Sequence, residues 1–82
     1  MDTSIDRATE FVVFGIENTA RRLGVSGSEI YQELKRNDGI KAFLYPSYPT
    51  LHTQGKDYIV DEILQFILSR NPSFLQQKGL KQ

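Results

Sequence analysis

The chain has 82 residues, no cysteine, and ten acidic side chains balanced by ten basic ones. A chain of this length buries one small core, which excludes a second domain, and without cysteine it has no disulfide framework, thiolate metal site or cysteine nucleophile. The zero net charge excludes a wide basic surface for nucleic acid or anionic membrane unless the charges are unevenly placed.

The first ten residues, MDTSIDRATE, are polar and acidic, whereas a secretory signal needs a cationic start followed by an apolar run. No stretch of the sequence approaches the roughly 18 apolar residues of a membrane-spanning helix. We therefore expect a soluble, cytoplasmic protein that does not bind membranes.

Residues 4–23 are predicted to form the first helix, because apolar residues recur there at steps of three and four. Gly24 is predicted to end this helix in the left-handed conformation. Val25 would then contact Ala20, as in a Schellman motif.

The second helix is predicted to begin after Ser26 and to end at Lys35 or Arg36. Ser26 serves as the N-cap, and Glu29, three residues later, completes a capping box. The segment Asn37-Asp38-Gly39 is predicted to break the helix.

A helix, a short turn and a second helix are also the elements with which some proteins read the DNA major groove. In that alternative the second helix would present its outward residues to DNA. Glu33 is predicted to be one of these residues, and its negative charge would repel the phosphates. We therefore favour a structural role for the turn and keep a helix-turn-helix DNA-binding regulator as the alternative function. Its DNA contacts would come from Arg21, Arg22, Ser28, Gln32, Lys35 and Arg36.

Residues 40–53 are predicted to form an ordered connector rich in tyrosine and proline. The two prolines of YPSYP disfavour the helical conformation for the residues that precede them, Tyr45 and Tyr48, and favour an extended one. The connector also carries too much apolar surface for a mobile linker, so we expect it to lie against the helices. This surface comes from Phe43, Leu44, Tyr45, Tyr48 and Leu51.

The last main helix is predicted over residues 54–70, where apolar side chains cover roughly 200° of the circumference, twice the usual stripe of a surface helix. Such a helix is either central in the fold or shared with another chain. Asp57 and Asp61 stand one turn apart on it, where they could share a cation or act as a carboxylate pair. Like charges at this spacing are usually part of a solvated face, which is the interpretation we favour. The prediction is a single all-α domain over residues 1–75, a bundle of three main helices with a helix-turn-helix-like first pair, followed by a disordered tail over residues 76–82.

The segment LHTQG gathers hydrogen-bonding groups at the predicted start of the last helix, where a helix N-terminus favours anions. His52, Thr53, Gln54, Gly55 and the nearby Tyr48 therefore form a possible ligand or anion site. The alternative is a neutral, hydrogen-bonded His52 that fastens the connector to the helix. With no second histidine and no cysteine we expect no metal site and no cofactor, and without a catalytic motif we expect no enzyme.

Phe14 is predicted to lie on the polar side of the first helix instead of in the core. Phe11 lies at the edge of the same side, and aromatic side chains often anchor protein contacts. Together with the wide apolar arc of the last helix, this predicts a protein–protein interaction module that forms a homo-oligomer, such as a dimer, or binds another protein. The predicted partner-binding residues are Phe11, Phe14, Glu17 and Asn18.

The sequence FVVFGIENTARRLGVSGSEIYQEL, followed by LHTQGKDYIVDEI, resembles a family of short bacterial proteins known as domain of unknown function 3791. The resemblance covers about residues 8–68 and implies no activity. Genes of this family often lie beside genes for a second family similar to ADP-ribosyltransferases, which implies an accessory or antitoxin-like subunit. The resemblance also suggests that Glu17 and Asn18 of FGIEN and residues 52–55 of LHTQG converge on a shared groove.

Overall fold

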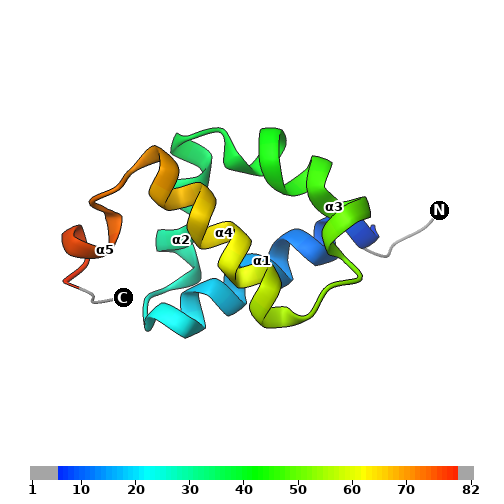
Figure 1. The fold of residues 1–82 in the computed structure, drawn as a ribbon, viewed down its shortest axis with the longest axis horizontal. Coiled ribbons are helices and arrows are strands. Elements are labelled where there is room, and N and C mark those ends of the chain that lie inside the picture. Colours follow the sequence, from blue (N-terminus) through cyan, green and yellow to red (C-terminus); the bar gives the residue numbers. More distant parts are fainter. Residues whose placement is uncertain (1–5, 80–82) are drawn as a thin grey trace.

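The computed structural model describes residues 6–79, and this part of the chain is helical with no strand. Figure 1 shows a small bundle in which α4 runs across α1 and α2. The all-α prediction is confirmed, but the count of three main helices is not, because the connector is helical as well. The elements in chain order are α1 (Arg7–Leu23), α2 (Gly27–Arg36), the π-helix η1 (Ile40–Leu44), α3 (Tyr45–Leu51), α4 (Lys56–Arg70) and α5 (Phe74–Gln77).

The ends of α1 are fixed by local hydrogen bonds. Asp6 is the N-cap, and its carboxylate accepts the backbone N–H of Thr9 at 2.9 Å. At the other end Gly24 takes the left-handed conformation, with a φ of 71°, and the N–H of Val25 donates to the carbonyl of Ala20 at 3.0 Å. The predicted Schellman ending is therefore confirmed. The predicted start at residue 4 lies outside the described residues.

The start of α2 carries the predicted capping box. The Ser26 hydroxyl accepts the backbone N–H of Glu29 at 3.2 Å, and the Glu29 carboxylate accepts the backbone N–H of Ser26, also at 3.2 Å. These bonds satisfy two backbone donors that a helix start leaves free. The turn Gly24-Val25-Ser26 is thus explained by a helix end followed by a helix start.

The connector differs from the prediction in one respect: Tyr45 and Tyr48 are helical and not extended. Pro46 stands in the first turn of α3, where its missing N–H costs no hydrogen bond. In a continuous α-helix the proline ring would clash with the carbonyl four residues earlier. The π-helical turn of η1 lies directly before it, with the Tyr45 N–H donating to the carbonyl of Ile40, five residues back.

The connector packs against the long helices, as predicted. Phe43 stacks on Phe66 of α4 with ring centroids 4.8 Å apart, while Leu44 and Leu51 are buried. The Tyr45 hydroxyl is hydrogen-bonded to the Thr9 hydroxyl of α1 at 2.8 Å. These contacts hold α3 beside the N-terminal half of α1.

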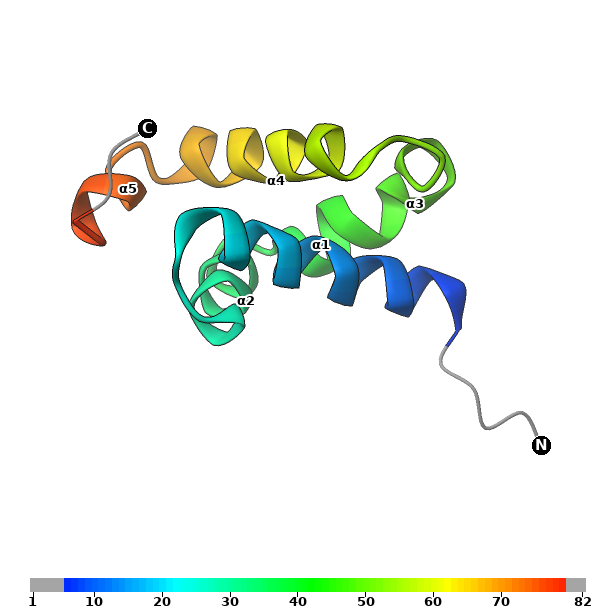
Figure 2. The ribbon, with the colours of Figure 1, turned by 90° about the horizontal axis from the view of Figure 1, so that it is seen from below.

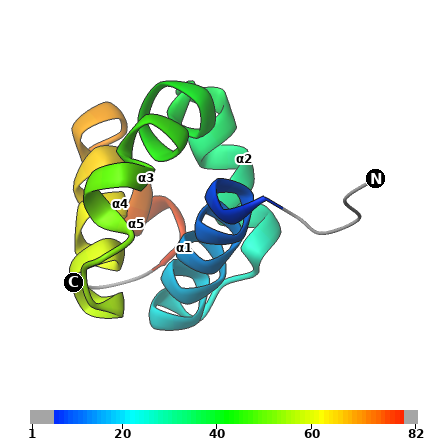
Figure 3. The same ribbon diagram turned by 90° about the vertical axis from the view of Figure 1, so that its right-hand side faces the viewer.

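Helix α4 packs mainly against α1, which also contacts α2 and α3. Figures 2 and 3 show α4 along one side of the molecule with α1 facing it, α2 and α5 toward one end and α3 toward the other. The apolar residues of the predicted arc are buried or half-buried within this chain, although α4 does not lie at its centre. None of the helices within residues 6–79 is long and apolar enough to cross a membrane. The buried residues of α4 are Ile59, Val60, Ile63, Leu64 and Ile67.

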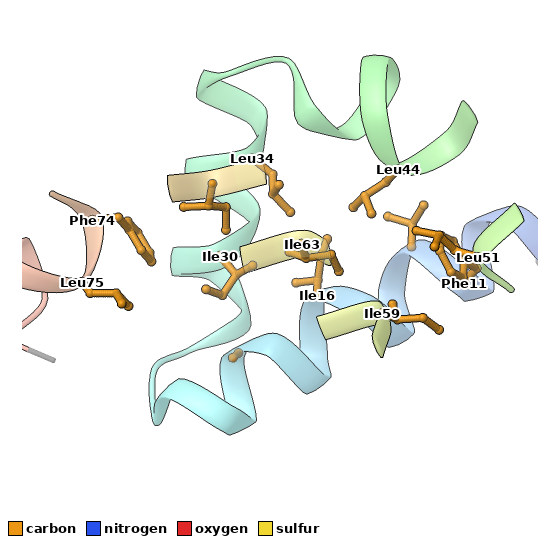
Figure 4. Close-up of a cluster of buried hydrophobic side chains, with 13 residues drawn as sticks. Phe11, Ile16, Ile30, Leu34, Leu44, Leu51, Ile59, Ile63, Phe74 and Leu75 are labelled. Atoms are coloured by element: carbon orange, nitrogen blue, oxygen red, sulfur yellow. The ribbon is translucent and has the colours of Figure 1, made fainter. Parts of the chain in front are cut away.

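Side chains from every α-helix meet in one core, which Figure 4 shows between α1, α2 and α4. The short helix α5 contributes Phe74 and Leu75, both buried. Beyond it, the Lys78 ammonium pairs with the Glu29 carboxylate at 3.0 Å, and this hydrogen bond lowers the pKa of Glu29 below its usual value. Residues 76–77, predicted to be in the disordered tail, belong to α5, and residues 80–82 lie outside the described part of the chain.

One polar side chain in the core lacks a partner. Thr19 of α1 is fully buried, and its hydroxyl makes no hydrogen bond. An unsatisfied buried hydroxyl costs about 1–3 kcal/mol, whereas valine has nearly the same shape without that cost. We expect Thr19→Val to raise the free energy of unfolding by about 1 kcal/mol in a urea titration, and Thr19→Ser, which keeps the hydroxyl and loses the methyl group, to lower it. Destabilisation by both variants would show that the hydroxyl is satisfied.

Candidate interaction surface

The outer side of α1 carries two neighbouring apolar side chains in contact with solvent. Val13 is 51% exposed and Phe14 is 42% exposed. Phe14 thus lies where its helical position predicts, whereas Phe11, three residues earlier, is only 7% exposed. We call Val13 and Phe14 the α1 ridge, and a hollow lies on each side of it.

On the side of α3, the ridge borders a cleft of about 380 Å³, which we call the aromatic cleft. The Phe11 ring meets the edge of the Tyr48 ring at a centroid distance of 5.6 Å, and Tyr48 stacks on His52 at 4.5 Å. Two side chains of opposite charge, Arg7 and Glu10, also line it. The full lining is Arg7, Glu10, Phe11, Phe14, Tyr48, His52, Gln54 and Ile59.

The aromatic cleft brings together residues that the sequence placed in two different candidate sites. Phe11 and Phe14, predicted as partner-binding, meet Tyr48, His52 and Gln54, predicted as a ligand or anion site. The other two residues of that predicted site, Thr53 and Gly55, are exposed and do not line the cleft. No local pattern could predict this meeting, because it depends on α3 folding back onto α1.

On the side of α2, the ridge borders a hollow of about 310 Å³, which we call the α1–α2 groove. The Glu17 carboxylate lies over the first turn of α2, because a Cβ atom added to Gly27 would stand 2.8 Å from Glu17 Oε2. Glu17 is the one charged side chain in this lining. The lining residues are Val13, Ile16, Glu17, Gly27, Ser28 and Tyr31.

Glu17 and Asn18 do not converge with residues 52–55, contrary to the expectation from the resemblance. Glu17 lines the α1–α2 groove, whereas Asn18 donates to the Phe14 carbonyl at 2.8 Å and lines a separate small hollow beside Arg22 and Lys56. Consecutive residues of an α-helix point about 100° apart, so neighbours in sequence face different helices. Glu17 faces α2, and Asn18 faces the start of α4.

The arginines proposed for DNA contact are largely engaged within the chain. The Arg22 guanidinium bridges the carboxylates of Asp57 at 3.0 Å and Asp61 at 2.5 Å. The hydrogen bonds to Asp61 and then to Asp57 raise the pKa of Arg22 above its usual value. Asp57 and Asp61 are both exposed, as expected for a solvated face, and both pair with Arg22 of α1, a contact that the sequence did not predict.

On α2, Arg36 forms an ion pair with Glu33. Glu33 was predicted to face outward, and this is wrong: it is 4% exposed and also accepts a hydrogen bond from Asn71, which follows α4. Among the other proposed DNA contacts, Ser28 lines the α1–α2 groove and Lys35 lies 5.9 Å from the centroid of the Tyr31 ring. Arg21 and Gln32 are exposed.

Residues 10–70 match the model of the family described as "Protein of unknown function (DUF3791)". The chain belongs to this family. The resemblance noted in the sequence is thereby confirmed, and the matched region of this DUF3791 protein contains the α1 ridge, the α1–α2 groove and the whole aromatic cleft except Arg7. No curated protein and no solved structure matches the chain.

The Arg22 bridge of this DUF3791 protein joins α1 to α4 at the surface, so its contribution should depend on salt. Exposed ion pairs contribute up to about 1 kcal/mol and are screened at high ionic strength. We expect Arg22→Gln to lower the free energy of unfolding by about 1 kcal/mol at low salt and by much less in concentrated NaCl. The matched control is Arg21→Gln, because Arg21 makes only one long bond, of 3.5 Å, to Asn18 of its own helix. Equal losses for both variants at all salt concentrations would contradict the bridge.

Proposed function

We propose that this DUF3791 protein is a small protein-interaction module and that its partner docks on the α1 ridge. The observation that carries the proposal is the exposure of Val13 and Phe14 side by side on α1, whereas the apolar arc of α4 is largely buried within the chain. Aromatic residues that project beside concave pockets are typical anchors of protein interfaces. The proposal assigns no catalytic role to the protein.

One docking face of ordinary size would cover a modest part of the surface of this chain. A specific interface covers about 800 Å² on each partner, which is roughly a seventh of the accessible surface of this chain, 5281 Å². Burial of exposed apolar area contributes about 25 cal/mol per Å², part of which offsets the cost of association. The ridge and its two hollows supply apolar surface at the centre of such a face, with polar residues such as Arg7 and Gln54 at its edge.

The partner we propose is a separate polypeptide and not a second copy. An exposed apolar arc on α4 would favour a helix shared between two copies, but the other helices of the same chain bury this arc. The implication of the family resemblance, an accessory or antitoxin-like subunit of an ADP-ribosyltransferase-like protein, is compatible with a docking face of this kind.

Site-specific photo-crosslinking in the native cell tests the proposal. A photoreactive phenylalanine derivative at position 14 should give one discrete crosslinked product. The same derivative at position 58 should give none, since Tyr58 of α4 is similarly exposed, at 49%, but lines neither the aromatic cleft nor the α1–α2 groove. A product of twice the chain mass would identify a homodimer instead of a separate partner, and the absence of a product specific to position 14 would refute the docking face.

A further inference from the structure

The two hollows beside the α1 ridge differ in charge. The aromatic cleft carries Arg7 and Glu10, whose charges oppose each other. The α1–α2 groove carries Glu17 alone, beside the apolar side chains of Val13 and Tyr31. A group that complements the groove therefore combines apolar surface with one positive charge.

The Glu17 side chain is exposed, and its carboxylate lies beside Gly27 in the first turn of α2. Tyr31, one turn further along α2, forms the opposite wall and is 39% exposed. The floor is supplied by Ile16, which is itself buried. A groove between two packed helices, with an apolar floor and a charge at one side, is a surface on which amphipathic helices dock.

Charge disfavours the parallel pairing of two copies along the α1 ridge. One helical turn before and after the ridge, the exposed residues are Glu10 and Glu17. Parallel pairing would place each glutamate against itself, with like charges directly opposite each other. Antiparallel pairing centred on the ridge would place Glu10 of one copy against Glu17 of the other, and Arg21 of one against Asp6 of the other, so attraction and repulsion offset each other there.

We propose that the α1–α2 groove binds an amphipathic helix of the partner protein, on which an apolar side chain enters the groove and a lysine or arginine one turn away pairs with Glu17. This inference rests on the proposed function and specifies the chemistry of the partner. The apolar side chain fills the space between Val13 and Tyr31, and the cation replaces solvent at the Glu17 carboxylate. Affinity then comes mainly from apolar burial, and selection among partners comes from charge.

The test uses the full chain and two synthetic amphipathic helices with the same leucine pattern, one with lysine and one with glutamate at every polar position. Each peptide is titrated into isotope-labelled protein and followed by NMR. We expect the Leu/Lys peptide to shift the amide signals of Val13, Gly27, Ser28 and Tyr31, and the Leu/Glu peptide to bind more weakly. Glu17→Lys should weaken the Leu/Lys peptide about tenfold and strengthen the Leu/Glu peptide.

Glu10→Lys is the matched control, because it makes the same charge change at an exposed position of the same helix that lines the cleft and not the groove. Equal effects of Glu17→Lys and Glu10→Lys would overturn the inference, since only the net charge would matter. Shifts confined to Phe11, Tyr48 and His52, peptide-independent dimerisation seen by sedimentation, or no binding would also overturn it. The crosslink at position 14 does not depend on these peptides, so it can succeed where the groove inference fails. Thermal melting of each variant shows that it is folded.

Discussion

Replacement of Ile63 by alanine is expected to lower the free energy of unfolding by about 4 kcal/mol and the melting temperature by about 20 °C. Ile63 is fully buried at the place where α4 meets α1, and Figure 4 shows it at the centre of the core. A domain of this size has a total stability of only about 4–12 kcal/mol. The substitution therefore removes a large part of the total free energy of unfolding. Circular dichroism during heating and during urea titration would measure this loss.

Ile63 packs closely against Gly15 of α1. A Cβ atom added to Gly15 would stand 2.7 Å from Ile63 Cδ1, so the glycine is required by close packing and not by its backbone conformation. We expect Gly15→Ala to destabilise the protein although alanine favours a helix. Valine lacks the Cδ1 atom, so Gly15→Ala in an Ile63→Val background should cost at least about 1 kcal/mol less than it does alone. Additive effects in this double-mutant cycle would show that the two residues do not compete for the same space.

Helix ends were predictable from the sequence because their signals are local. Gly24 after α1 and the pair Ser26 and Glu29 before α2 act within three or four residues, and each occupies the predicted role. The connector was harder to predict, because the statistical preference of a residue before proline was overridden by packing. Tyr45 is helical, and the two residues just before it are held by packing: Phe43 stacks on α4, and Leu44 lies in the core.

The candidate site was predicted in part. The angular position of Phe14 on α1 was sufficient to place it at the surface, since a single helix determines that property. Its neighbours across the aromatic cleft come from α3 and the turn before α4, and a helical period contains no information about them. The same limit explains the error at Glu33, which the periodicity of α2 predicts to face solvent. Its covering partner, Asn71, lies 38 residues later in the chain.

Hydrogen bonds to the buried Glu33 carboxylate connect the end of α2 to the end of α4. Its carboxylate accepts hydrogen bonds from the side-chain amides of Asn37 at 3.1 Å and Asn71 at 3.0 Å, and it pairs with Arg36. With a side chain only 5% exposed, the charge is stabilised by these donors more than by water. Removal of the carboxylate takes one acceptor from each donor, although the Asn37 amide still donates to the Glu33 carbonyl and the Asn71 amide to Gln77.

We therefore expect Glu33→Ala to lower the free energy of unfolding by about 3 kcal/mol, because hydrogen bonds to a charged group contribute about 1.5–3 kcal/mol each and both asparagine amides lose one, whereas the largely exposed Arg36 regains water. Glu33→Gln should cost less, about 1–2 kcal/mol, because its amide oxygen can accept from both asparagines, which share Oε2, while its NH2 group faces Arg36. The matched control is Gln32→Ala, at the exposed neighbouring position, which should change stability by less than about 0.5 kcal/mol. Urea titrations of the three variants measure these differences. If Glu33→Ala costs no more than the control, the desolvation of the carboxylate cancels its hydrogen bonds, and α2 is held to α4 by apolar packing alone.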